Sequence, residues 1–134
     1  METVLETSVW IDLFRAKTPA PVRAQIKPLV AREDLALCEP LLFELLRNAA
    51  AGQRSFIQRH LATIPVLSTP PTLWADAIEL GQRYCGAGLA TGALDLMIAA
   101  ICIHHDAELI AFDQQFAGMA KLSRLRVRIL TRAA

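Results

Sequence analysis

Four acidic residues lie within or directly after apolar stretches of the sequence, where carboxylates are unusual. Asp95 lies within residues 93–100, the most apolar stretch of the chain, where an ionised carboxylate is costly unless it is paired or binds a metal. Glu6 and Asp113 come directly after apolar, strand-like runs, and Glu44 lies among leucines and a phenylalanine. Carboxylates that converge repel one another, and hard cations such as Mg²⁺ or Mn²⁺ relieve that repulsion. Together the four are candidates for a metal site that activates water against a phosphodiester.

Each acid also has an ordinary structural interpretation. Asp95 fits the cap or first turn of a helix that starts after a glycine, where the helix dipole stabilises negative charge. Glu6 and Asp113 fit loop or cap positions, and Glu44 fits a helix position that is solvated or paired with Arg47. The residues taken singly leave both interpretations open.

Strands and helices alternate along the chain. Apolar β-type runs predict strands at 3–5, 35–38, 108–112 and 125–130, and a short extended piece at 65–67. Helical spacing predicts helices after the N-cap signal Thr7-Ser8, over 19–32, from Pro40, from 53 to about 62, from 72 to 84 and over 93–105. This order predicts an α/β fold, a three-layer α/β/α sandwich with a mostly parallel central sheet. Ligands bind at the carboxyl ends of such strands, where Glu6 and Asp113 would share one rim.

The composition bounds the class of protein. The chain has 134 residues, of which 54% are hydrophobic and 20% charged, so it can bury one core and shows no sign of disorder. We expect one domain, 1–134. The mean hydropathy is high, +0.35, but the longest apolar run, 96–103, is far shorter than the roughly 20 residues that span a membrane. The first residues also lack the features of a signal peptide, which predicts a cytoplasmic location.

The distribution of charge allows a further prediction. The net charge is +1, yet all five charged residues after Asp113 are basic. Arg124, Arg126 and Arg128 alternate, so on a strand they share a face that can bind nucleic-acid phosphates or keep an edge strand from aggregating.

The cysteines form no CxxC pair, which predicts small buried hydrophobes rather than disulfides or a zinc site: Cys38, Cys85 and Cys102. The aromatic residues at apolar helix positions are expected to be core or interface anchors: Trp10, Trp74 and Phe56.

Four blocks occur in a specific order. They are a strand, an acid and Thr-Ser-x-Trp-Ile-x-Leu at 4–13; an acid followed by leucines at 43–46; Asp-x-x-Ile-Ala-Ala at 95–100; and a strand ending near an acid and a Phe at 109–116. Across essentially the whole chain this order and spacing resemble the PIN-domain ribonucleases, in particular the VapC toxins of bacterial toxin–antitoxin pairs.

The resemblance implies a PIN-like fold and a metal-dependent endoribonuclease. It places four acids around Mg²⁺ or Mn²⁺: Glu6, Glu44, Asp95 and Asp113. The hydroxyl of Thr7 or Ser8 would help to place a ligand or water. Water activated at that site would attack phosphorus in line and leave a 5′ phosphate and a 3′ hydroxyl. The resemblance also implies a homodimer, a VapB-type antitoxin whose C-terminal segment covers the acidic crevice, and a substrate such as tRNA or rRNA.

The first acid departs from the family pattern, which usually has Asp where this chain has Glu6. The extra methylene moves the carboxylate by more than about 1 Å, a misplacement that can cost roughly a hundredfold in rate. Activity is then reduced, metal preference is shifted, or the Glu is an engineered change. Two other functions therefore stay open: a catalytically impaired PIN module that acts by binding RNA or protein, and an α/β regulatory domain with solvated acids.

Overall fold

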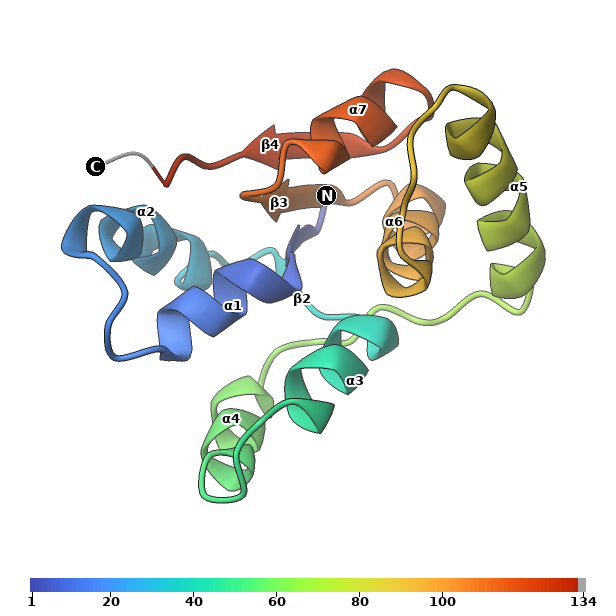
Figure 1. Ribbon diagram of the computed structural model, residues 1–134. Coiled ribbons are helices and arrows are strands. Elements are labelled where there is room, and N and C mark those ends of the chain that lie inside the picture. Colours follow the sequence, from blue (N-terminus) through green and yellow to red (C-terminus); the bar gives the residue numbers. More distant parts are fainter. Residues whose placement is uncertain (133–134) are drawn as a thin grey trace.

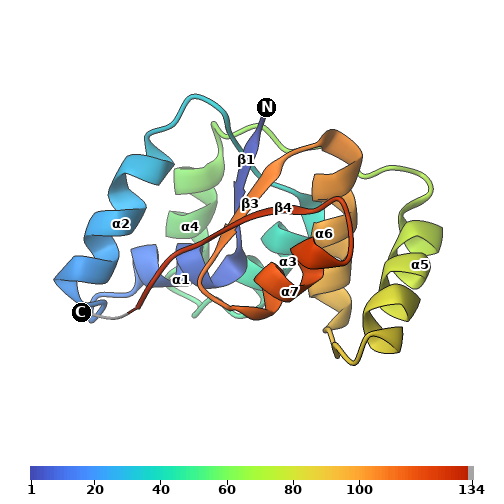
Figure 2. The same ribbon diagram turned by 90° about the horizontal axis from the view of Figure 1, so that it is seen from above.

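A four-stranded parallel sheet forms the centre of the molecule. The computed structural model describes residues 1–132. Its strands are β1 (Thr3–Leu5), β2 (Leu35–Ala36), β3 (Glu108–Ala111) and β4 (Arg126–Ile129), in the order β2-β1-β3-β4. Every pairing within the sheet is parallel, and helices pack on both of its sides (Figures 1 and 2). The predicted α/β sandwich with a parallel central sheet is confirmed.

Seven helices surround the sheet within residues 1–132. They are α1 (Thr7–Phe14), α2 (Ala20–Val30), α3 (Glu39–Arg47), α4 (Arg54–Leu61), α5 (Leu73–Gly86), α6 (Ala93–His105) and α7 (Gln115–Lys121). In Figure 1, α7 lies above β4, whereas α1, α3 and α6 lie below the strands. Among these residues no helix has both the length and the apolar character that crossing a bilayer requires.

The strand order reverses between β1 and β3. These two strands are neighbours, and the chain continues from them in opposite directions, from β1 to β2 and from β3 to β4. In parallel sheets, ligands bind at the carboxyl ends of the strands where the order reverses in this way. Glu6 directly follows β1, and its backbone N–H donates to the carbonyl of Ile110 in β3 (2.9 Å). Asp113 follows β3 after one intervening residue, so both acids lie at the carboxyl ends of these neighbouring strands.

The structure departs from the expected elements in three places. The strand expected over 35–38 is shorter, because Leu37 pairs with Val66 of the extended piece instead. The helix expected over 19–32 ends at Val30. Helix α7 is not among the expected elements, since its sequence, QFAGMAK, is short and contains a glycine. Its signal is the three-residue spacing of the buried side chains of Phe116 and Met119.

The expectation for the cysteines is wrong at one position. Cys38 and Cys102 are buried, but Cys85 is exposed, and all three are free. Helix α5 buries the face that carries Ala77, Leu80 and Tyr84, and Cys85 lies off that face. Burial raises the pKa of the Cys38 thiol to about 11, which makes it a poor nucleophile.

Of the three aromatic anchors, one lies in the core. Trp10 is fully buried and stacks on Phe14. The side chains of Phe56 and Trp74 are 51% and 66% exposed, so these two are left as candidates for an interface rather than for the core.

Candidate metal centre

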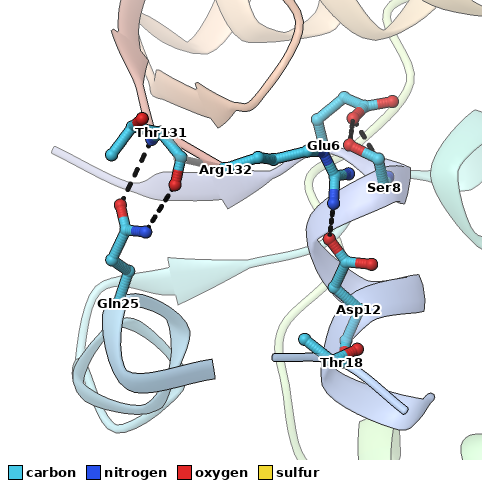
Figure 3. Close-up of polar contacts among 7 residues, drawn as sticks. All are labelled: Glu6, Ser8, Asp12, Thr18, Gln25, Thr131 and Arg132. Carbon is cyan, nitrogen blue, oxygen red and sulfur yellow. Dashed lines mark hydrogen bonds and ion pairs between the residues drawn. The ribbon is translucent and has the colours of Figure 1, made fainter. Parts of the chain in front are cut away.

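Glu6 joins β1 to α1 and caps that helix. Its side chain is buried, and Oε2 accepts hydrogen bonds from the backbone N–H (3.0 Å) and the hydroxyl (2.5 Å) of Ser8 (Figure 3). The expectation that Thr7-Ser8 forms the cap is wrong by one residue, because both lie in the first turn of α1. A carboxylate here satisfies a free N–H group and interacts favourably with the helix dipole.

Glu44 reaches this centre from α3. It is half-buried, and the hydroxyl of Thr7 donates a very short hydrogen bond to its Oε1. The alternative interpretation, a surface pair with Arg47, does not describe this structure, because the guanidinium of Arg47 lies over the ring of Phe43, 5.4 Å from its centroid. The hydrogen bond between Thr7 and Glu44 therefore connects Glu44 to the residue that directly follows Glu6.

Asp95 and Asp113 both lie at helix starts. Asp95 is half-buried in the first turn of α6, whose N-cap is Gly92. Asp113 is exposed, and its Oδ1 accepts a hydrogen bond from the backbone N–H of Gln115 (2.9 Å) as α7 begins. The ordinary interpretation of these acids is thus confirmed for their position in the chain. It is compatible with a metal site, since the bond to Asp113 Oδ1 is the hydrogen bond described for these two carboxylates within residues 1–132.

The four carboxylates influence one another's charge. Burial raises the pKa of Glu6, the nearby charges of Asp95 and Glu44 raise it further, and the bonds from Ser8 oppose this. Burial also raises the pKa of Asp95, and the charges of Glu44 and Asp113 add to the effect. In the part of the chain that the structure describes, the ion pairs lie elsewhere, so none of these acids is neutralised by a basic side chain. Electrostatic interactions therefore connect Asp95 with each of the other three acids, Glu6, Glu44 and Asp113.

This donor set fits a hard divalent cation in its chemistry. All donors are carboxylate oxygens, and their uncompensated charge is of the kind that Mg²⁺ or Mn²⁺ balances. In the described conformation, however, no three Asp, Glu, His or Cys side chains among residues 1–132 are grouped closely enough to hold a metal ion. Glu6 and Glu44 are turned toward the hydroxyls of Ser8 and Thr7. Binding a cation would thus require a rearrangement of these side chains.

The raised pKa values predict how pH affects the metal-free protein. A carboxyl group whose pKa is raised on folding stabilises the protein at pH values below its ordinary range and loses that contribution as pH rises through the folded value. In EDTA we therefore expect the melting temperature of Asp95→Asn, relative to the parent chain, to increase as pH rises from about 4 to 7. Thermal unfolding at a series of pH values measures this difference, and adding Mg²⁺ should narrow it.

The matched control for this prediction is Asp76→Asn. Asp76 also lies in the first turn of a helix, α5, but it is not one of the four acids of the centre. A difference between Asp95→Asn and the parent chain that stays constant from pH 4 to 7 would show that folding does not raise the pKa of Asp95.

The arginines of β4 do not gather at this centre. Arg126 lies opposite Glu108, the first residue of β3, and its guanidinium pairs with Asp106 (2.8 Å). It is therefore at the amino-terminal end of the strands, whereas the acids lie at the carboxyl ends. Arg124 precedes it, and Arg128 is exposed on the same strand. Contact between these three arginines and RNA stays a prediction.

A different arginine lies near the carboxyl ends of the strands. Arg132 donates from Nη1 to the buried carboxylate of Asp12 in a very short ion pair, and its guanidinium lies 4.1 Å from the ring centroid of Phe112. Sequence reasoning missed both members of this pair. A signal was present, since Asp12 interrupts an apolar helix as Asp95 does.

Comparison with known proteins places the chain in a family. A sequence model of the PIN domain matches residues 3–122. The chain is 30% identical to Ribonuclease VapC21 of Mycobacterium tuberculosis over 115 residues, which cover 83% of each chain. It is 26% identical to Ribonuclease VapC11 of the same organism, over 92% of this chain and 95% of that protein.

The fold agrees with solved structures of related proteins. The crystal structure of VapBC2 from Rickettsia felis, bound to a DNA fragment from its promoter, superposes with a TM-score of 0.76 at 18% identity, over 97% of this chain and 99% of the other. VapBC-5 from Mycobacterium tuberculosis superposes with a TM-score of 0.70 at 19% identity, over 96% and 98% of the two chains. The match over residues 3–122 and the identity to VapC21 show that this chain belongs to the PIN domain family.

Proposed function

We propose that this protein is a metal-dependent endoribonuclease, the toxin of a VapBC toxin–antitoxin pair, and that residues 1–134 act as one PIN domain. The observation that carries the proposal is the group of four carboxylates without basic partners among residues 1–132, located where the strand order reverses. The names of the relatives VapC21 and VapC11 support ribonuclease activity. The proposal includes the cytoplasmic location predicted from the sequence.

The residues that would hold Mg²⁺ or Mn²⁺ in this proposal are Glu6, Glu44, Asp95 and Asp113. When bound, the ion would supply Lewis-acid activation of water and of the phosphodiester. Ser8 and Thr7 each bind one carboxylate oxygen, on Glu6 and Glu44 respectively. These hydroxyls restrain the two long side chains. Once the carboxylates turn toward a cation, the hydroxyls can donate hydrogen bonds to water instead.

The test of the proposed function is cleavage of total bacterial RNA, which contains tRNA and rRNA, by purified protein with Mg²⁺, with Mn²⁺ or with EDTA. We expect cutting that requires the metal and leaves a 5′ phosphate and a 3′ hydroxyl. Equal cutting in EDTA would contradict metal dependence. Absence of cutting under all conditions would favour the impaired binding module, and absence of Mn²⁺ binding in calorimetry would favour the regulatory domain.

The antitoxin partner is supported by the solved relatives, which are VapBC complexes. A groove of about 520 Å³ between α1, α3 and α4 offers apolar side chains to such a partner, among them Ile11, Phe14 and Leu45. It borders the same helices that carry Thr7 and Glu44. We propose that a VapB-type antitoxin binds along these helices and that its C-terminal segment covers the carboxylates.

A homodimer is the last part of the proposal, and the exposed face of α5 is its candidate interface. Trp74 and Ile78 are 66% and 61% exposed there, and they border an almost wholly apolar groove of about 390 Å³ with Leu96 and Met97 of α6. Burying such a face in a second copy removes apolar surface from water. We expect Ile78→Glu to convert a dimer into a monomer, measured by sedimentation equilibrium.

The control for the interface is Phe56→Glu, which places the same charge on another exposed aromatic position. It should leave the dimer intact. A parent chain that is monomeric at tens of micromolar would contradict the homodimer, and dissociation by Phe56→Glu alone would place the interface on α4.

A further inference from the structure

After β4 the chain continues as a strap, residues 130–132, over the carboxyl ends of the strands. The backbone N–H of Leu130 donates to the carbonyl of Ala111 (2.8 Å). The side-chain amide of Gln25 in α2 then bonds twice to Thr131, donating to its carbonyl (2.6 Å) and accepting from its N–H (3.2 Å) (Figure 3). The strap is therefore fixed to both β3 and α2, and it carries Arg132 across α1.

The guanidinium of Arg132 is held in one orientation. One N–H group is bound by Asp12, whose side chain is 5% exposed, and the planar group stacks on the ring of Phe112. A buried carboxylate needs such a partner because an unpaired buried charge is strongly destabilising. The Arg132 side chain is nevertheless 52% exposed, and within residues 1–132 Asp12 is the hydrogen-bond partner described for it. Several of its five N–H donors are thus open to a ligand.

The neighbours of Arg132 connect it to the carboxylate centre. Asp12 lies one helical turn, about 6 Å along the axis, from Ser8, the residue that binds Glu6. Phe112 immediately precedes Asp113. Figure 3 shows the Arg132 side chain reaching Asp12 of α1, the helix whose first turn carries Ser8. A fixed cation with open donors is therefore attached to the helix that Glu6 caps and to the residue that precedes Asp113.

We propose that Arg132 binds a phosphate of the RNA strand next to the bond that is cut. This inference rests on the proposed function and adds a substrate-binding residue to it. The acidic centre by itself repels a polyanion, and a guanidinium already oriented by Asp12 and Phe112 can donate two parallel hydrogen bonds to phosphate oxygens. Because the pair and the stacking fix the side chain in advance, little rotamer entropy is lost on binding.

The competing explanation is that Arg132 only neutralises Asp12. Two variants separate the explanations. Arg132→Gln removes the cation and leaves Asp12 without its counter-charge, so both stability and RNA affinity should fall. The double variant Asp12→Asn with Arg132→Gln replaces the ion pair by two neutral amides, which should restore most of the melting temperature. If Arg132 binds phosphate, the double variant should not recover RNA binding.

The measurement is binding of a fluorescent single-stranded RNA pool in Mg²⁺, with all variants in an Asp95→Asn background that does not cut. We expect the double variant to bind about 10–100-fold more weakly than the Asp95→Asn protein, as for loss of charge-assisted hydrogen bonds. Its dependence of log affinity on log salt should also become shallower by roughly one phosphate contact. Arg59→Gln, which removes the same charge from the exposed surface of α4, should change affinity little.

The outcomes distinguish this inference from the proposed function. If the parent chain cuts RNA and the double variant binds RNA with unchanged affinity and salt dependence, the phosphate-binding role is overturned and the nuclease stands. If the parent chain neither binds nor cuts RNA, the proposed function and this inference both fail. Loss of affinity equal to that of Arg59→Gln would reduce Arg132 to a general surface charge and would also overturn the inference.

Discussion

Replacing Asp95 with Asn should abolish metal-dependent RNA cleavage and raise the melting temperature of the metal-free protein at pH 7. Asp95 is the acid whose pKa is raised by both Glu44 and Asp113, after burial itself. The neutral amide removes this repulsion, and so it stabilises the fold. It also removes a ligand from the centre, and a loss of several kcal/mol of charge stabilisation corresponds to a decrease of roughly 100–1,000-fold in kcat/KM.

The opposite signs of the two effects make this experiment informative. A residue that serves only the fold would lose stability and activity together. Asp76→Asn is the matched control, since Asp76 lies in the first turn of α5, where an acid is stabilised by the helix dipole. It should lower the melting temperature slightly and leave cleavage unchanged. Unchanged cleavage by Asp95→Asn, in a preparation free of other nucleases, would remove Asp95 from the site.

The sequence predicts the carboxylate centre because its signals are local. Glu6 and Asp113 follow short apolar runs, and parallel strands necessarily bring their carboxyl ends to one edge. Asp95 is conspicuous because the helix around it is apolar. The start of α6, at Ala93, also agrees with the prediction, since a glycine precedes a long apolar segment. These signals are local, whereas the placement of Glu6 and Asp113 on neighbouring strands depends on the pairing of β1 with β3.

What the sequence does not predict depends on distant contacts or on side-chain reach. Arg132 and Asp12 are separated by 120 positions, and their pairing exists only because β4 lies beside β3 and directs the strap across α1. Local spacing cannot identify such a partner. The position of the helix cap depends on how far a side chain extends, and Glu6 is long enough to fold back onto Ser8. Glu6 and Glu44 accept hydrogen bonds from Ser8 and Thr7, and within residues 1–132 the acids are not arranged as a finished ligand set.

Replacing Glu6 with Asp should therefore increase metal-dependent cleavage, by about tenfold and up to roughly a hundredfold, the range associated with a displacement of about 1 Å. In the present chain both described hydrogen bonds to the Glu6 carboxylate come from Ser8. Aspartate is also a favoured N-cap residue, and its shorter side chain would keep the carboxylate closer to the end of β1. Comparison of kcat/KM for the two proteins, with Mg²⁺ and with Mn²⁺, measures the change.

The control for this substitution is Glu6→Gln, which preserves side-chain length and can still accept the hydrogen bonds from Ser8 but carries no charge. It should lose cleavage while folding normally. Activity in Glu6→Asp together with none in the parent chain would identify the parent as an impaired nuclease, because the remaining acids and the fold would then be sufficient. Equal or lower activity in Glu6→Asp would instead mean that the longer carboxylate is the proper ligand of this protein, which would leave the impaired-module alternative without its physical basis.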